Sequence, residues 1–139
     1  MEKFINFLKE KSMKIVNKTN EFVDQTKDKI KDNLLNDQLK RRFQLENPHK
    51  MLVSEKVTPV NMIQELTSSH AKIYEDDNVF VFYGPKKDNG IQIGYYIRNL
   101  ATMEEFIVKD ILEVEVPVTY KEKVYEVLAT AVYCEAYDG

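Results

Sequence analysis

The side chains most often used in catalysis are sparse in this chain of 139 residues, which has two histidines, His49 and His70, and one cysteine, Cys134. A cysteine nucleophile needs a neighbouring cation or histidine that lowers its pKa. The sequence neighbours of Cys134 are Tyr133 and Glu135, and neither supplies such a cation. One cysteine and two separated histidines also do not make a zinc ligand set. We therefore expect no enzymatic activity, no metal and no cofactor.

Pairs of carboxylates are present, and Glu113 and Glu115 have the spacing that matters most. In a strand, residues i and i+2 share one face at about 7 Å, a separation at which two carboxylates can cleave a glycosidic bond. A solvent-exposed strand face explains the same spacing without any chemistry. The acidic run at 75–78 lacks the glycine-containing loop of an EF-hand. None of the four glycines lies in a phosphate-binding loop.

Charge is distributed unevenly along the chain, whose net charge is −3. Residues 1–47 carry +3 (11 basic, 8 acidic), and residues 48–139 carry −6 (9 basic, 15 acidic). The acidic body argues against nucleic acid as a partner, because phosphate binding needs a basic surface. The N-terminus lacks the pattern of a signal peptide, and no apolar run approaches the roughly 20 residues that span a bilayer. We expect a cytoplasmic protein.

The first 47 residues contain neither proline nor glycine, the residues that usually end helices. Their apolar side chains recur with a helical period, which predicts an amphipathic helix from about residue 3 to residue 33. A second stripe, Leu35, Leu39 and Phe43, faces another direction and predicts a bend near residue 34, and Pro48 ends the helix. A stripe of this kind must be buried. We therefore assign self-association to Phe4, Leu8, Ile15, Phe22, Val23 and Ile30.

Two other ways of covering the stripe stay open. It can pack only on the body of its own chain, or it can lie on a membrane surface. The second alternative rests on lysines at the boundaries of the apolar sector, which can extend their charges into lipid headgroups. These boundary lysines are Lys9, Lys11, Lys18, Lys27 and Lys29. The heptad pattern is not sustained, so a short antiparallel bundle suits the stripe better than a long parallel coiled coil.

The rest of the chain reads as mostly β. A short helix is expected to begin at Thr58–Pro59 and to end near 68–70. Val79–Tyr83 is rich in β-forming residues, Asn89–Gly90 is a strong turn dipeptide, and the segment from Ile91 to Ile97 resembles a returning strand. We therefore predict a β-hairpin over residues 79–97.

Residues 100–139 leave two architectures open. Clean alternation over 112–117 favours a strand stopped at Pro117, with a second strand at 123–128 pairing to it through a turn. Thr119 and Glu122 also fit a capping box, and the apolar residues that follow fit one face of a helix. We favour the two strands because β-branched residues and tyrosine dominate both segments.

Tyrosine supplies the candidate recognition residues. All eight tyrosines lie from Tyr74 onward, and Tyr83, Tyr95 and Tyr96 flank the predicted hairpin. Tyrosine covers sheet edges because of its β propensity, but it is also enriched at protein interfaces. We interpret these three as a surface for a partner or a ligand.

The sequence thus predicts an α+β protein. A helical arm, residues 1–47, precedes a body, residues 48–139, with a small antiparallel sheet and one or two short helices. We expect a non-enzymatic, homo-oligomeric protein-binding module, an adaptor or inhibitor of a bacterial or phage system, whose arm self-associates and whose acidic body binds an unknown protein. The alternatives are a small-ligand-binding protein with an aromatic pocket between subunits, and a peripheral membrane protein bound through the N-terminal helix.

Overall fold

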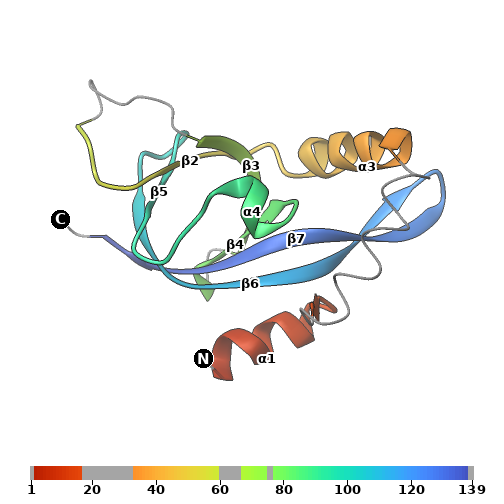
Figure 1. The fold of residues 1–139 in the computed structure, drawn as a ribbon, viewed down its shortest axis with the longest axis horizontal. Coiled ribbons are helices and arrows are strands. Elements are labelled where there is room, and N and C mark those ends of the chain that lie inside the picture. Colours follow the sequence, from red (N-terminus) through yellow and green to blue (C-terminus); the bar gives the residue numbers. More distant parts are fainter. Residues whose placement is uncertain (1, 17–32, 60–66, 75–76, 138–139) are drawn as a thin grey trace.

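The computed structural model describes residues 2–16, 33–59, 67–74 and 77–137 (Figure 1). They form an α+β protein around an antiparallel sheet of seven strands. In chain order the elements are α1 (Glu2–Glu10), β1 (Lys14–Ile15), α3 (Asn33–Glu46), β2 (Lys50–Ser54), β3 (Thr67–Tyr74), β4 (Val79–Tyr83), α4 (Lys86–Asn89), β5 (Tyr96–Asn99), β6 (Glu105–Tyr120) and β7 (Lys123–Ala136).

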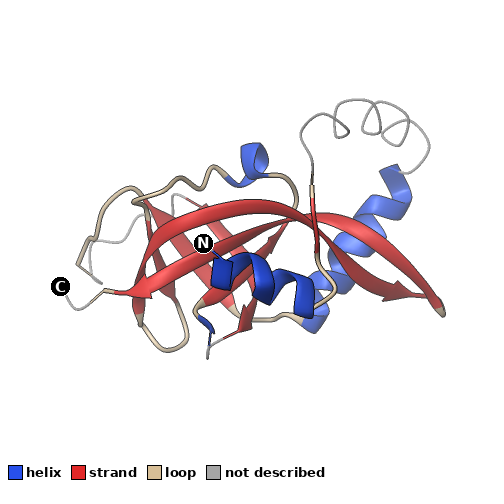
Figure 2. Cartoon of the chain, turned by 90° about the horizontal axis from the view of Figure 1, so that it is seen from below, coloured by secondary structure: helices blue, strands red, loops and turns tan. Residues whose placement is uncertain are grey.

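Six of the strands close into a barrel. Their order around the ring is β2–β3–β4–β7–β6–β5, and β5 pairs again with β2. The longest strands are β6 and β7, with 16 and 14 residues, and they pair with each other almost throughout. Their distal part projects beyond the other strands as a two-stranded hairpin (Figure 2), to which β1 adds a short third strand.

Alternate side chains of the strands fill the interior of the barrel. In β4, Phe80 and Phe82 point inward while Val79 and Val81 point outward, as the two-residue period of a strand requires. Every residue of the interior core is at most 2% exposed: Met51, Val53, Ala71, Phe80, Phe82, Ile91, Ile97, Val108, Val132 and Cys134.

A second core lies on the outer face of β4, β6 and β7, where α1 and α3 cover it. The β6–β7 ribbon twists between the two helices, so that it meets α1 on one side and α3 on the other (Figure 1). From α1 come Phe4, Phe7 and Leu8, and from α3 come Leu39 and Phe43. The sheet is therefore buried on its inner face by the barrel core and on its outer face by the two helices.

The helix predicted over Leu35, Leu39 and Phe43 is confirmed as α3, which ends just before Pro48. Leu39 and Phe43 are each 3% exposed, and Leu35 packs beside them. The last turn is closed by Asn47, whose backbone N–H and side-chain Nδ2 both donate to the carbonyl oxygen of Phe43, at 3.0 and 2.8 Å.

The single long helix predicted for the N-terminal segment is wrong, and the structure shows no long arm among the described residues. Helix α1 has nine residues, and β1 follows it. Its end is a Schellman motif, in which the N–H of Met13 donates to the carbonyl of Leu8 and the N–H of Ser12 to that of Lys9. Ser12 adopts the left-handed conformation, with φ 61°, that glycine usually supplies. Residues 17–32 of the predicted helix lie outside the described part of the chain.

The hairpin predicted over residues 79–97 is also wrong. The first strand forms as β4, but β5 begins only at Tyr96 and pairs with β2 and β6. The expected turn instead folds as the short helix α4, which Gly90 closes in the left-handed conformation with φ 66°. The chain then crosses the end of the barrel, because β4 and β5 stand three places apart in the ring.

Asn89 holds this crossover in place. Its side-chain Nδ2 donates to the carbonyl oxygens of Tyr83 and Pro85 and to Oγ1 of Thr130, at 3.1 to 3.2 Å. Oγ1 of Thr130 in turn donates to the carbonyl oxygen of Gly84 at 2.8 Å. Asn89 is only 8% exposed, so these bonds satisfy an amide that would otherwise be costly to bury.

The two strands predicted at 112–117 and 123–128 are confirmed as parts of β6 and β7, joined by a two-residue turn. The predicted stop at Pro117 is wrong. The turn makes Tyr120 and Lys123 a hydrogen-bonded pair, so Pro117 falls at a position whose N–H would point away from β7. The strand therefore continues through the proline without losing a bond to its partner.

The helix predicted to begin at Thr58–Pro59 falls mainly on residues 60–66, which lie outside the described part of the chain. Its predicted end at 68–70 belongs to β3 instead. The boundary at residue 47 stays a prediction, although α1 and α3 share a core with β4, β6 and β7.

Candidate functional site

Tyr83, the candidate recognition residue in β4, packs under α3 and supports it. The hydroxyl of Tyr83 donates to the carbonyl oxygen of Asn36 at 3.2 Å, and its ring packs against Phe43 with 5.8 Å between centroids. Burial, together with the nearby Asp37 carboxylate, raises the pKa of Tyr83 above its usual value. Half-buried under a helix, Tyr83 offers little surface to a partner.

Tyr95 and Tyr96 lie at the start of β5, on the opposite side of the barrel ring from β4. The hydroxyl of Tyr95 donates to Oε1 of Glu55 at 3.3 Å, and the ring of Tyr96 meets Tyr137 edge-on at 5.1 Å. The structure therefore does not bring Tyr83 together with the other two. Their assignment to recognition stays a prediction, but it no longer describes one continuous patch.

The residues assigned to self-association have separate locations. Phe4 and Leu8 are 3% and 0% exposed in the outer core of their own chain, as the packing alternative expected. Ile15, in β1, is 38% exposed. The remaining three, Phe22, Val23 and Ile30, lie outside the described residues. Contact of Phe4 or Leu8 with a second chain would require α1 to leave the sheet.

The reactive side chains do not meet. Cys134 lies fully buried inside the barrel, where desolvation raises the pKa of its thiol, and His70 lies on the outer face of β3. Glu113 and Glu115 share one face of β6, as predicted. Among the described residues, no three His, Cys, Asp or Glu side chains are placed to hold a metal ion.

A shallow groove lies beside the C-terminal half of α3. We call it the α3–β3 groove; its volume is about 470 Å³, and its described lining residues are Arg41, Gln44, Leu45, Pro48 and His70. Leu45 is 75% exposed there, so a large apolar side chain faces the solvent at the groove. Leu34, at the other end of the helix, is 81% exposed.

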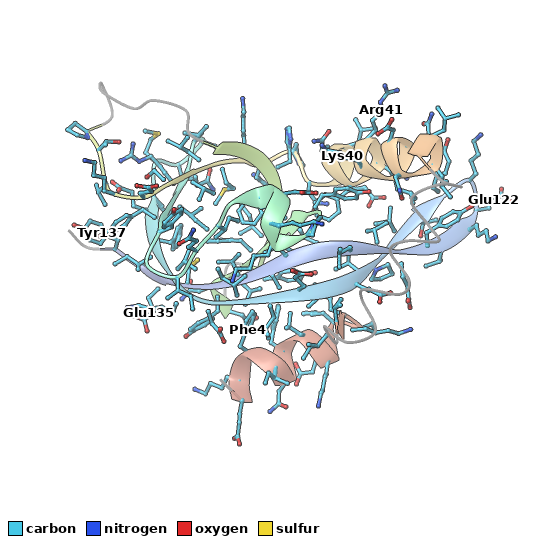
Figure 3. The ribbon with its side chains drawn as sticks, in the orientation of Figure 1. Phe4, Lys40, Arg41, Glu122, Glu135 and Tyr137 are labelled. Carbon is cyan, nitrogen blue, oxygen red and sulfur yellow. The ribbon has the colours of Figure 1, made fainter. Side chains whose placement is uncertain are left out.

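Geometry explains why α3 has these outward leucines. Leu35, Leu39 and Phe43 follow the i, i+4, i+8 spacing that faces the sheet, whereas Leu34, Arg41 and Leu45 follow i, i+7, i+11 on another side. Figure 3 shows Arg41 on the side of α3 that faces away from the β6–β7 hairpin.

Arg41 places a positive charge at the groove, although the whole chain is acidic. Arg41 and His70 line it, and Lys50 is the direct cross-strand neighbour of His70 on the outer face of β2. None of the described lining residues carries a carboxylate. The nearby acid Glu46 is paired with Arg42 at 3.0 Å. The described lining of the groove therefore combines the apolar Leu45 and Pro48 with the cationic Arg41.

Sequence reasoning missed this groove. Neither Leu34 nor Leu45 is among the residues that the sequence patterns assign to a binding surface. The spacing of Leu34, Arg41 and Leu45 is visible in the sequence. His70 lines the groove only because α3 packs beside β3, and it lies 25 positions after Leu45 along the chain.

We found no protein family, no curated protein and no solved structure to which this chain is detectably similar. None of the described helices combines the length and the apolar content needed to cross a bilayer. The α3–β3 groove is therefore the feature from which we infer a function.

Proposed function

We propose that the chain is a non-enzymatic binding protein whose α3–β3 groove takes a short segment of another protein, one in which an acidic residue lies close to a large apolar residue. The barrel is the scaffold, and α3 presents the binding surface. The observation that carries the proposal is Leu45, which is 75% exposed in a groove edged by Arg41 and His70.

The energetics favour a modest but specific interaction. Covering a leucine side chain contributes about 1.5–3 kcal/mol, and a partner side chain that fills the groove beside Pro48 adds a similar amount. A carboxylate placed at Arg41 forms a charge-assisted hydrogen bond, which the guanidinium can donate in bidentate form. Because Leu45 and Arg41 both lie on a regular helix, little of the protein has to become ordered when a segment binds.

The groove also determines the sign of the charge that a preferred partner segment carries. The guanidinium of Arg41 at the groove attracts an acidic segment and repels a basic one. The proposal keeps the expectation of a protein partner, but it moves recognition from the acidic parts of the body to the α3–β3 groove.

The proposal is tested with synthetic peptides that each hold one leucine or phenylalanine flanked by either aspartates or lysines. Fluorescence anisotropy should show that the acidic set binds at least about tenfold more tightly, a difference of about 1.4 kcal/mol. Leu45→Ser should weaken the acidic set by a similar factor, and Arg41→Glu should reverse the charge preference.

Lys3→Glu is the matched control, because it makes the same charge change on the exposed side of α1, where an acid in the first turn suits the helix dipole. It should bind the acidic peptides as the wild type does. Equal binding of acidic and basic peptides by the wild type would refute the proposal. If the protein binds anionic vesicles but none of the acidic peptides, the result would point to a lipid surface instead.

A further inference from the structure

The two edges of the projecting β6–β7 hairpin differ in how they are protected. On the β6 edge, β1 pairs with Val114 and Glu115, and the N–H of Val16 donates to the carbonyl of Glu113. Beyond β1 on the same edge comes Pro117, which has no N–H to offer. Both features are ways in which native sheets prevent pairing with another chain.

Within the described part of the chain, the β7 edge has neither protection. Its pairing with β4 ends at Ala129, and the last bond on this edge among the described residues runs from the N–H of Gly84 to the carbonyl of Leu128. From the turn geometry, the backbone groups that point outward beyond this bond belong to Val124 and Glu126. Among the described residues none bonds to these groups, and the Val124 side chain is 63% exposed.

Charged side chains close to this edge are held within their own chain. Lys123 lies over the ring of Tyr125, 5.4 Å from its centroid, and Glu126 pairs with Lys14 at 2.6 Å. The Lys14 ammonium lowers the pKa of Glu126, which keeps that pair charged. Neither charge is therefore placed to repel an incoming strand at the level of Tyr125.

We infer that the β7 edge pairs with the β7 edge of a second copy of this chain, antiparallel and with Tyr125 on the twofold axis. This surface is independent of the α3–β3 groove. An antiparallel pair of identical strands needs a register in which like charges do not face each other, because directly opposed like charges destabilise a sheet. That requirement selects one register here.

With Tyr125 on the axis, Val124 faces Glu126 of the partner subunit and Lys123 faces the partner's Val127, so no like charges are opposed. Moving the axis to Glu126 opposes two glutamates. Moving it to Val124 opposes Glu122 and the partner's Glu126. The favoured register forms about four backbone hydrogen bonds and places the two Tyr125 rings as a cross-strand aromatic pair.

The strand pairing is limited in length. It spans Lys123–Val127, because β4 occupies the same edge from Ala129 onward. The tip of the hairpin, marked by Glu122 in Figure 3, projects beyond the barrel. An interface of this size is at the weak end of protein–protein contacts, and we expect a dimer whose fraction rises with protein concentration.

The first test is analytical ultracentrifugation of the full chain over a wide range of concentration. The wild type should shift from monomer to dimer. Val124→Pro removes one outward N–H without touching a bond to β6, since Pro117 occupies the equivalent kind of position on the other strand. It should stay monomeric at concentrations where the wild type dimerises.

Thr119→Pro is the matched control, because Thr119 is the direct partner of Val124 in the ladder and its N–H points to the opposite edge. It should dimerise as the wild type does. A wild type that remains monomeric throughout, or equal loss of dimer in both proline variants, overturns the inference. Leu45→Ser should leave the dimer unchanged, which separates this surface from the groove.

A second measurement does not depend on the proline variants folding. Under mild oxidation, Tyr125→Cys should form an interchain disulfide, since non-hydrogen-bonded antiparallel neighbours have their Cα atoms about 4.5 Å apart. Lys123→Cys, which lies off the axis, should crosslink much more slowly. The native Cys134 is fully buried and does not compete. Equal rates for the two variants would contradict the proposed register.

Discussion

The helices α1 and α3 contribute to the same outer core, but of the two only α3 keeps large apolar side chains exposed. Phe4, Phe7 and Leu8 of α1 are all 6% exposed or less. α3 buries Leu39 and Phe43 just as completely, yet leaves Leu34 and Leu45 in solvent. The large buried side chains of α1 all serve to cover the core. In α3 the buried side chains do the same, but covering the core does not explain its exposed leucines. The unexplained part is where we place the binding function.

The largest expected effects come from the buried anchors of the two helices. Leu8→Ala should lower the free energy of unfolding by about 3 kcal/mol and Phe43→Ala by about 4 kcal/mol, because each leaves a cavity in the outer core. Leu45→Ser should change it by less than about 0.5 kcal/mol, as exposed positions do. Urea unfolding followed by circular dichroism measures all three. A neutral Leu8→Ala would show that α1 does not dock on the sheet in solution.

The ends of the two helices should respond in opposite directions. Ser12→Gly should raise the free energy of unfolding by about 1 kcal/mol, because Ser12 holds a left-handed conformation that costs a side chain free energy. Asn47→Ala should lower it by about 1 kcal/mol, because the side-chain bond to the carbonyl of Phe43 is lost. Thermal melts of the two variants beside the wild type are sufficient. If Ser12→Gly is destabilising, the Schellman motif at the end of α1 is wrong.

A smaller effect should appear at alkaline pH under α3. Burial and Asp37 raise the pKa of Tyr83 in the folded chain, so the unfolded chain loses the phenol proton at a lower pH than the folded one. The folded state therefore binds more protons above about pH 10, and stability falls as pH rises through that range. Unfolding measured from pH 8 to 11 should show a shallower alkaline loss for Tyr83→Phe. An unchanged slope would mean that Tyr83 is not covered by α3.

Much of the local structure was predictable from the sequence. The spacing of Leu35, Leu39 and Phe43 predicted a helix with the correct buried face, and the β-branched residues of 112–117 and 123–128 predicted the correct strands. In these segments local propensity and tertiary packing agree, which is the usual condition for a correct reading. The α+β class followed from the same patterns.

The failures have identifiable physical causes. The end of α1 was missed because Ser12 does what a glycine usually does, so the absence of glycine before Gly84 did not mean an uninterrupted helix. The prediction of a hairpin at 79–97 is wrong because Asn89–Gly90 also suits the end of a helical turn, and the amide of Asn89 is satisfied by Thr130, 41 positions away. Barrel closure and the groove depend on such distant contacts, which no local pattern encodes.

The closed ring also has a consequence for biosynthesis. β7 comes last among the barrel strands, yet it is the one that joins β4 to β6. Until it has been translated, β4 has an unpaired edge, and Phe80 and Phe82 lack neighbours such as Val132 and Cys134. Chains stalled on the ribosome before this point should therefore remain sensitive to protease and should recruit chaperones. The reason is that the barrel becomes a cooperative unit only when its last strand, β7, is in place.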